Sequence, residues 1–167
     1  MKMIKFKAFR NQLNKRNAML EFRKAQFQMF CLLKQPTVFL LGISLAYRDE
    51  KVCIKLPFHK RNQNYLRQMA FAPILAGAEC AAAFPLLSEI YLNKLPVKFM
   101  IKSGGFDISR PLKSNGIFMV PNIEDVKSEL EGRWRNKSLE IPVDLYDHEN
   151  NVIGRFKFDA VLKQRAA

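Results

Sequence analysis

The longest apolar run of the chain covers residues 69–87, which read MAFAPILAGAECAAAFPLL and carry one charge, Glu79. The run is long enough to span a bilayer, but a carboxylate near the centre of a membrane costs several kcal/mol. Pro73 and Pro85 also argue against a spanning segment. A helix that is apolar all round and lies outside a membrane should be buried in protein. Because an acidic side chain is rarely buried without a partner, we expect Glu79 to be paired or functional.

The first part of the chain has a helical pattern. Over residues 4–34, apolar residues recur at spacings of three and four among basic residues, which predicts a helix that Pro36 ends. Its two apolar stripes are Phe9, Leu13 and Leu20, and Phe22, Met29 and Leu33. Two stripes indicate a helix that contacts more than one surface.

Two strands are predicted between this helix and the apolar run. Residues 37–47 are rich in β-branched and aromatic residues, and residues 51–57 alternate between apolar and polar. A polar turn at residues 48–50 joins them. A polar loop, residues 59–64, then leads into the apolar helix.

The second half of the chain predicts four strands and a short helix. The strands are residues 97–101 continuing through 106–112, 117–120, 139–146 and 152–162. Gly104-Gly105 suggests a bulge in the first of them, and Asn115-Gly116 is a hairpin-turn signal before the second. Asn122 is a candidate N-cap for a helix that ends near Trp134.

This order of elements predicts an α+β fold with six strands. A helix buried on all sides in such a protein implies a curved antiparallel sheet wrapped around it. One small sheet cannot cover the helix completely, so we expect a second copy of the chain to cover the rest, as a dimer or tetramer. No repeat or low-complexity linker interrupts the sequence, and we expect one domain, residues 36–167, after a basic helical segment, residues 1–35.

Charge distinguishes the N-terminal segment from the rest. Of the formal net charge of +13, residues 1–36 supply +8, from nine Lys and Arg residues and one acid, Glu21. Such an excess favours anionic partners: a phosphorylated cofactor, nucleic acid or an anionic membrane. The three cysteines have no C-x-x-C spacing, so we expect neither a disulfide framework nor a metal site. The N-terminus lacks the apolar core of a signal peptide, which favours a cytoplasmic protein.

Several short motifs follow one another along the chain. They are Pro36 through Gly42-Ile43, Arg61-Asn62, Met69 and Phe71 with Gly77-Ala78-Glu79, Phe106, Arg110-Pro111, and Asp147 through Val152 with Asn151 in place of a usual glycine. In this order they resemble a family of thioesterase-like hotdog proteins, related to acyl-coenzyme A thioesterases, over residues 36–165. The resemblance implies the hotdog fold, a curved six-stranded antiparallel sheet around a central helix, here with an extra N-terminal helix. It also implies an acyl thioester such as acyl-CoA as ligand, without a further cofactor.

One motif departs from the pattern of better-characterised relatives. Many hotdog thioesterases enter the central helix through a His-Gly-Gly-like segment, whose backbone amides polarise the thioester carbonyl. The corresponding residues here are Arg67-Gln68-Met69-Ala70. This departure weakens the inference of catalysis.

Glu79 is the first candidate for a catalytic role. A carboxylate in an apolar setting can act as general base on water, or attack the thioester carbonyl itself, and related thioesterases carry an acid at this helix position. The alternative is a buried carboxylate that holds the helix in register. Asn62, Asn64 and Gln68 precede the helix, where they could orient water or donate to an oxyanion, or only satisfy local backbone.

The remaining candidates are histidines and cations. His59 could pair with Glu79 in a dehydratase-like site, whereas His148 belongs to a polar turn. Arg110, Lys113 and Lys102 could bind the phosphates of coenzyme A, or form a solvated strand surface. The basic N-terminal helix could lie on anionic lipid, or pack on the sheet with its charges in water.

Three functions follow from these observations. The first is an acyl-CoA thioester hydrolase, with Glu79 as base or nucleophile. The second is a protein of the same fold that binds an acyl chain or acyl-CoA without turnover. The third is an interaction protein whose basic helix docks on a membrane or an acidic partner. Nucleic-acid binding is not expected, because the aromatic residues follow helical stripes rather than forming a stacking platform.

Overall fold

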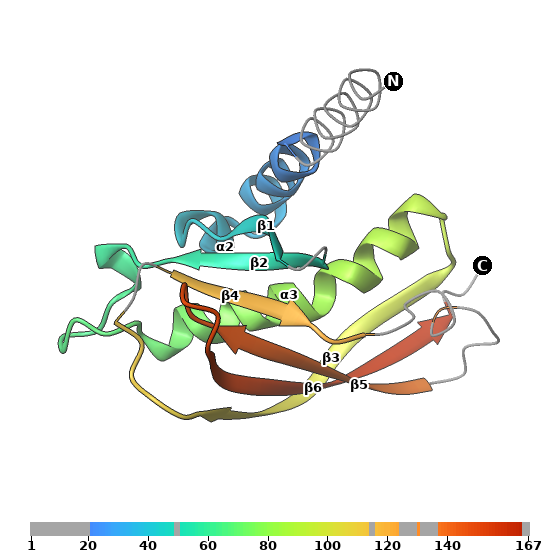
Figure 1. Ribbon diagram of the computed structural model, residues 1–167. Helices are drawn as coiled ribbons and strands as arrows, with labels where there is room; N and C mark the ends of the chain where they lie inside the picture. The colour runs from blue at the N-terminus through green and yellow to red at the C-terminus, as the bar shows by residue number, and fades with distance from the viewer. Residues whose placement is uncertain (1–20, 49–50, 114–115, 124–129, 131–136, 165–167) are drawn as a thin grey trace, which may run out of the picture.

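The computed structural model describes residues 21–48, 51–113, 116–123, 130 and 137–164 (Figure 1). One antiparallel sheet of six strands has the order β1-β2-β4-β5-β6-β3. The strands are β1 (Ser44–Arg48), β2 (Lys51–Pro57), β3 (Val97–Ile108), β4 (Gly116–Pro121), β5 (Lys137–Tyr146) and β6 (Val152–Gln164). The helices are an N-terminal helix described over residues 21–34, α2 (Pro36–Leu40), a 3-10 turn (Lys60–Asn62) and α3 (Phe71–Leu92).

The long helix α3 packs against one face of the curved sheet, where it contacts β2, β4, β5 and β6 (Figure 1). Small residues make this close packing possible, since Gly77, Ala78, Ala81 and Ala82 are all buried. A Cβ atom on Gly77 would come within 2.7 Å of Met119 Sδ on β4, so the glycine lets helix and sheet approach. The predicted sheet around a central helix is therefore confirmed.

As expected for one small sheet, α3 is not covered completely in the single chain. Phe71, Leu75 and Glu79 are exposed on its first half, and Tyr91 and Leu92 are exposed at its end. The physical reason is that the sheet covers only one face of the helix. By length and apolarity α3 could also cross a membrane. Its sheet-facing side, however, belongs to the hydrophobic core of the domain.

The N-terminal helix packs on the domain through one face. Phe27 and Cys31 belong to the hydrophobic core, and the Phe27 ring lies edge-on to Phe84 of α3 at a centroid distance of 5.6 Å. The side chain of Gln28 donates a hydrogen bond of 2.6 Å to the backbone oxygen of Ile43. The predicted helix is confirmed over residues 21–34, and its predicted part before residue 21 lies outside the described residues.

The segment after this helix differs from the prediction. Residues 36–40 form the short helix α2, and of the predicted strand, residues 37–47, only residues 44–47 are extended, as part of β1. Pro36 lies in the first turn of α2, where its missing N–H leaves no hydrogen bond unmade. Gly42, with φ of +70°, then turns the chain toward β1. Pro36 therefore begins a second helix instead of a strand.

The bulge of β3 lies at Lys102 and not at Gly104-Gly105 as predicted. The pairing with β6 shifts between Ile101 and Ser103, which leaves Lys102 as the extra residue. This shift turns Gly104 and Phe106 toward the helix side, opposite the buried residues Phe158 and Phe156. Gly104 instead makes room for a ring, because a Cβ there would lie 2.9 Å from Phe158 Cδ1.

Two more predictions concern the second half of the chain. The strands that flank the predicted hairpin do not pair with each other, because β4 pairs with β2 and β5 while β3 pairs with β6. Gly116 opens β4, and Asn115 and most of the predicted helix from Asn122 to Trp134 lie outside the described residues. The final hairpin of β5 and β6 is confirmed, and in its turn Asn150, rather than Asn151, takes the left-handed conformation, with φ of 72°.

The close approach of β3 and β6 at Gly154 gives a test of this packing. A Cβ on Gly154 would lie 2.6 Å from the backbone oxygen of Asp107, so Gly154→Ala must displace backbone. We expect it to lower the free energy of unfolding by about 1–3 kcal/mol in urea denaturation. Gly105→Ala is the control, because its Cβ would meet nothing within 4 Å. Equal effects of the two substitutions would contradict this account.

Candidate functional site

An open pocket of about 590 Å³ lies between the N-terminal helix and α3. On the α3 side, lining residues recur at helical spacing and lie on one stripe of the helix: Ala76, Glu79, Cys80, Ala83 and Leu87. The opposite wall comes from the N-terminal helix, the segment after it and β2; it includes Phe27, Phe30, Cys31, Gln35, Val38 and Val52. The volume is in the range of small-molecule sites.

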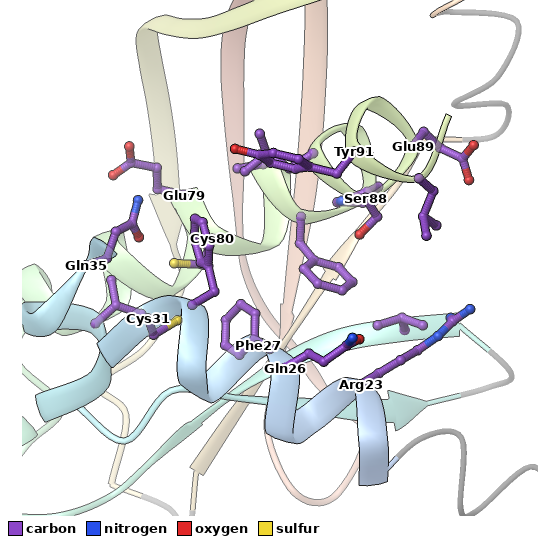
Figure 2. Close-up of a pocket in the computed structure, with 18 of the residues that line it drawn as sticks. Arg23, Gln26, Phe27, Cys31, Gln35, Glu79, Cys80, Ser88, Glu89 and Tyr91 are labelled. Carbon is purple, nitrogen blue, oxygen red and sulfur yellow. The ribbon is translucent and has the colours of Figure 1, made fainter. Parts of the chain in front are cut away.

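Polar groups lie at the two ends of this pocket. Glu79 and Gln35 lie at one end, and Arg23, Gln26 and Glu89 lie toward the other (Figure 2). Between them, Phe27, Cys31 and Cys80 make the middle of the pocket apolar (Figure 2). The arrangement fits an elongated apolar ligand with a polar group at the Glu79 end.

Glu79 is exposed in the single chain, on the border between the pocket stripe and the uncovered face of α3. The expectation that Glu79 is paired or functional stays a prediction, and the alternative of a buried carboxylate that holds the helix in register does not fit this chain alone. The reason is the same as for the helix as a whole, because no element of the sheet reaches this side of α3. The carboxylate is open to water and to a ligand in the pocket.

The two pocket thiols are poor nucleophiles. Burial raises the pKa of the Cys31 thiol to about 11. Burial also raises the pKa of the Cys80 thiol to about 12, and the nearby Cys31 and Glu79 add to the rise. Because the thiolate is the reactive form, both thiols stay protonated and unreactive near neutral pH.

Asn62 is fully buried at the junction of three segments. Its side-chain Nδ2 donates to the backbone oxygens of Leu41, at 2.9 Å, and Pro57, at 2.8 Å. Its own backbone oxygen accepts a bond of 2.7 Å from the N–H of Ala70, the N-cap of α3. Both amide protons are thus used within the fold, and a catalytic role for Asn62 stays a prediction.

Asn64 and Gln68 form a tight loop before α3. The Asn64 Oδ1 atom accepts hydrogen bonds from the backbone N–H groups of Leu66 and Gln68, at 3.0 and 3.1 Å. The Asn64 N–H donates in turn to the Gln68 oxygen at 2.8 Å. These residues lie outside the pocket lining. Glu79 follows Ala70 by nine residues, about 13 Å along a helix axis, so one chain does not bring the loop to Glu79.

The candidate phosphate-binding cations are separated. Arg110 pairs with Asp147 through Nη2 and Oδ2 at 2.6 Å. The pKa of Asp147 lies below its ordinary value. The causes are hydrogen bonds from the Asn151 side chain and from the N–H groups of Asn151 and Glu149, together with the charge of Arg110. Lys113 and Lys102 are exposed, and Lys102 precedes Arg110 by eight residues, roughly 25 Å of extended chain. The three residues do not form one cluster.

The histidines lie outside the pocket lining. His59 precedes the 3-10 turn, and His148 is exposed in the β5–β6 turn with Nε2 at 3.6 Å from Oε1 of Glu149. Across the part of the chain that the structure describes, no group of three or more His, Cys, Asp or Glu side chains is arranged to hold a metal ion.

The sequence did not indicate that the N-terminal helix contributes to a wall of this pocket. Phe27 and Cys31 continue the helical stripe of Phe9, Leu13 and Leu20, and Gln35 follows the helix. The spacing of Phe27 and Cys31, four residues apart, marks one helical face. That signal is weak, because a four-residue spacing is common in any helix.

No protein-family model matches the sequence, and no curated protein matches it. Solved structures do match. A putative thioesterase from Shewanella oneidensis superposes with a TM-score of 0.70 at 12% identity, covering 90% of this chain and 99% of its own. A thioesterase from Haemophilus influenzae gives a TM-score of 0.63 at 14% identity, covering 84% of this chain and 90% of its own.

A third match is a Bacillus halodurans protein whose structure contains CoA. Its TM-score is 0.58 at 11% identity, with 78% of this chain and 80% of its own covered. At such identities the similarity concerns the fold. The chain has the hotdog fold, as the resemblance in its sequence implies.

Replacement of Asn62 tests its structural role. Asn62→Ala leaves two backbone oxygens, of Leu41 and Pro57, without their donor, and we expect a loss of about 2–3 kcal/mol in the free energy of unfolding. Gln63→Ala is the control, because no hydrogen bond of its side chain appears among the described residues. Chemical denaturation measures both. A small loss for Asn62→Ala, matching the control, would contradict the structural role.

Proposed function

We propose that this protein hydrolyses an acyl thioester such as acyl-CoA, with Glu79 as general base or nucleophile. The observation that carries the proposal is the position of this carboxylate at one end of an apolar pocket between the N-terminal helix and α3. The pocket would hold the acyl chain, and the polar end would receive the thioester. The CoA in the Bacillus halodurans structure of the same fold supports this choice of substrate class.

Two reaction routes are open to Glu79. In the first, its carboxylate takes a proton from water while the water oxygen attacks the thioester carbonyl. In the second, a carboxylate oxygen attacks the carbonyl and water then hydrolyses the resulting anhydride. Both routes break the carbon–sulfur bond and release a carboxylic acid and the thiol of CoA. The pocket thiols take no part, because both remain protonated.

Completion of the site requires a second copy of the chain. The first turn of α3 has no side-chain cap, so its N–H groups could donate to the thioester oxygen. In one chain these groups lie about 13 Å from Glu79 along the helix. A twofold partner that packs on the uncovered face of α3 could bring its own helix start to Glu79.

An exposed surface on the molecule suits such a partner. Phe71 and Leu75 of α3 are exposed, and the Phe71 ring contacts exposed Phe106 of β3 at a centroid distance of 4.5 Å. The strand β3 is also an edge of the sheet, whose unpaired backbone groups favour pairing with another chain. We therefore propose a homodimer as the basic assembly.

Binding of an acyl thioester without turnover is the second candidate function. It is favoured by the segment Arg67-Gln68-Met69-Ala70, which lacks the glycines of many active relatives, and by the use of both Asn62 protons in the fold. This candidate keeps the same pocket and ligand class. It differs only in the fate of the thioester bond.

Substitution of Glu79 separates the two candidates. Glu79→Gln preserves shape but removes the base, so hydrolysis of medium- and long-chain acyl-CoAs should fall by roughly 100-fold or more, with ligand affinity and Tm nearly unchanged. Glu140→Gln, an exposed acid on β5, is the control. A wild-type protein that binds acyl-CoA without turnover would favour the binding function, and unchanged hydrolysis in Glu79→Gln would refute the role of Glu79.

The assembly has its own test. Light scattering over a dilution series should give a dimer or tetramer down to low micromolar concentration, since the Phe71–Phe106 surface is apolar. Leu75→Asp should weaken the assembly, because it places a charge in the apolar contact. Leu66→Asp is the control, because Leu66 is exposed in the loop before α3. A stable wild-type monomer would rule out the proposed homodimer.

A further inference from the structure

The N-terminal helix has a second apolar face that packs on nothing in the described structure. Phe22, Met29 and Leu33 lie on one line of the helix and are 62%, 57% and 68% exposed. Their spacing of seven and four residues puts them on one face. Phe27 and Cys31, which pack on the domain, lie on the opposite face.

The short helix α2 carries two more exposed apolar residues, Phe39 and Leu40. The docking surface, as we define it, consists of Phe22, Met29, Leu32, Leu33, Phe39 and Leu40. These are six of the sixteen large hydrophobic residues that are exposed among the described residues, within a segment of nineteen residues. Exposed apolar residues concentrated in one segment favour an interaction site, since large apolar patches on soluble proteins mark such sites.

Charge decides which partner suits the docking surface. Residues 1–36 carry nine basic residues and one acid, and Arg23 and Lys34 are exposed on the described part of the helix. A second copy of the chain would bring the same basic segment against this one, and the like charges would repel. An anionic bilayer offers acyl chains for the apolar residues and phosphate groups for the cations.

We propose that the N-terminal helix and α2 dock the protein on an anionic bilayer, with Phe22, Met29 and Leu33 inserted at the boundary between headgroups and acyl chains. The opposite face of the same helix forms a wall of the pocket, with Arg23 and Gln26 at the end away from Glu79 (Figure 2). A helix is about 10–12 Å across. Docking therefore holds the pocket close to the lipid surface, whatever the chemistry at Glu79.

Vesicle cosedimentation of the full-length protein tests the proposal. We expect binding to phosphatidylcholine vesicles that contain phosphatidylglycerol, weaker binding in high salt, and little binding to phosphatidylcholine alone. The variant Phe22→Gln/Met29→Gln/Leu33→Gln should bind at least about 100-fold more weakly. The control Tyr65→Gln/Leu66→Gln/Met100→Gln changes the same classes of exposed residue elsewhere and should bind like the wild type.

Every other outcome overturns the proposal. If the wild type does not bind vesicles, docking on a membrane is ruled out. If the first variant binds as well as the wild type, docking through Phe22, Met29 and Leu33 is ruled out. If that variant changes the oligomeric state but not vesicle binding, the surface is an interface between copies. A second readout addresses misfolding of the triple variant and uses a Trp134→Phe background, so that the introduced tryptophan is the one that emits. The emission of Phe22→Trp should shift to shorter wavelength with anionic vesicles, and that of Met100→Trp should not.

Discussion

The close contact between α3 and the sheet determines the other surfaces of this molecule. Gly77 allows the helix to lie against Met119 of β4, and Ala78, Ala81 and Ala82 continue the same flat face. A bulkier residue at position 77 would have to move the buried Met119 side chain. Because the small residues occupy the sheet side of α3, Phe71, Leu75 and Glu79 fall on the side that the sheet leaves open.

The sequence predicted best those elements whose pattern is local. The strand over residues 51–57 and the hairpin of residues 139–162 follow from alternation and turn residues, and the apolar run identified α3. The pattern predicts a strand from residue 37, where the structure has the helix α2, because β-branched and aromatic residues also fit a short helix that begins with Pro36. The bulge at Lys102 was missed for another reason. It follows from the register against β6, and no local signal marks it.

The same distinction between local and distant signals holds for the candidate site. Glu79 was identifiable because a single charge in an apolar run is a strong local signal. The position of Asn62 was not, because its partners Leu41 and Pro57 come together only when the loop, β2 and the start of α3 meet. The pocket also escaped prediction, since part of its lining comes from a helix more than forty residues before Glu79 in sequence. Motif spacing therefore identified the acid but not the cavity beside it.

The N-terminal helix connects two properties of the chain that seem separate in the sequence. One of its faces closes the pocket with Phe27 and Cys31, and the desolvation there keeps the thiols of Cys31 and Cys80 protonated. The opposite face leaves Phe22, Met29 and Leu33 in water, where their exposure opposes solubility unless something covers them. Two apolar stripes on one helix are thus used differently, one for packing within the chain and the other available for contact outside it. A helix with this division can hold the pocket at a surface without being displaced from the domain, because docking requires none of the contacts that Phe27 makes.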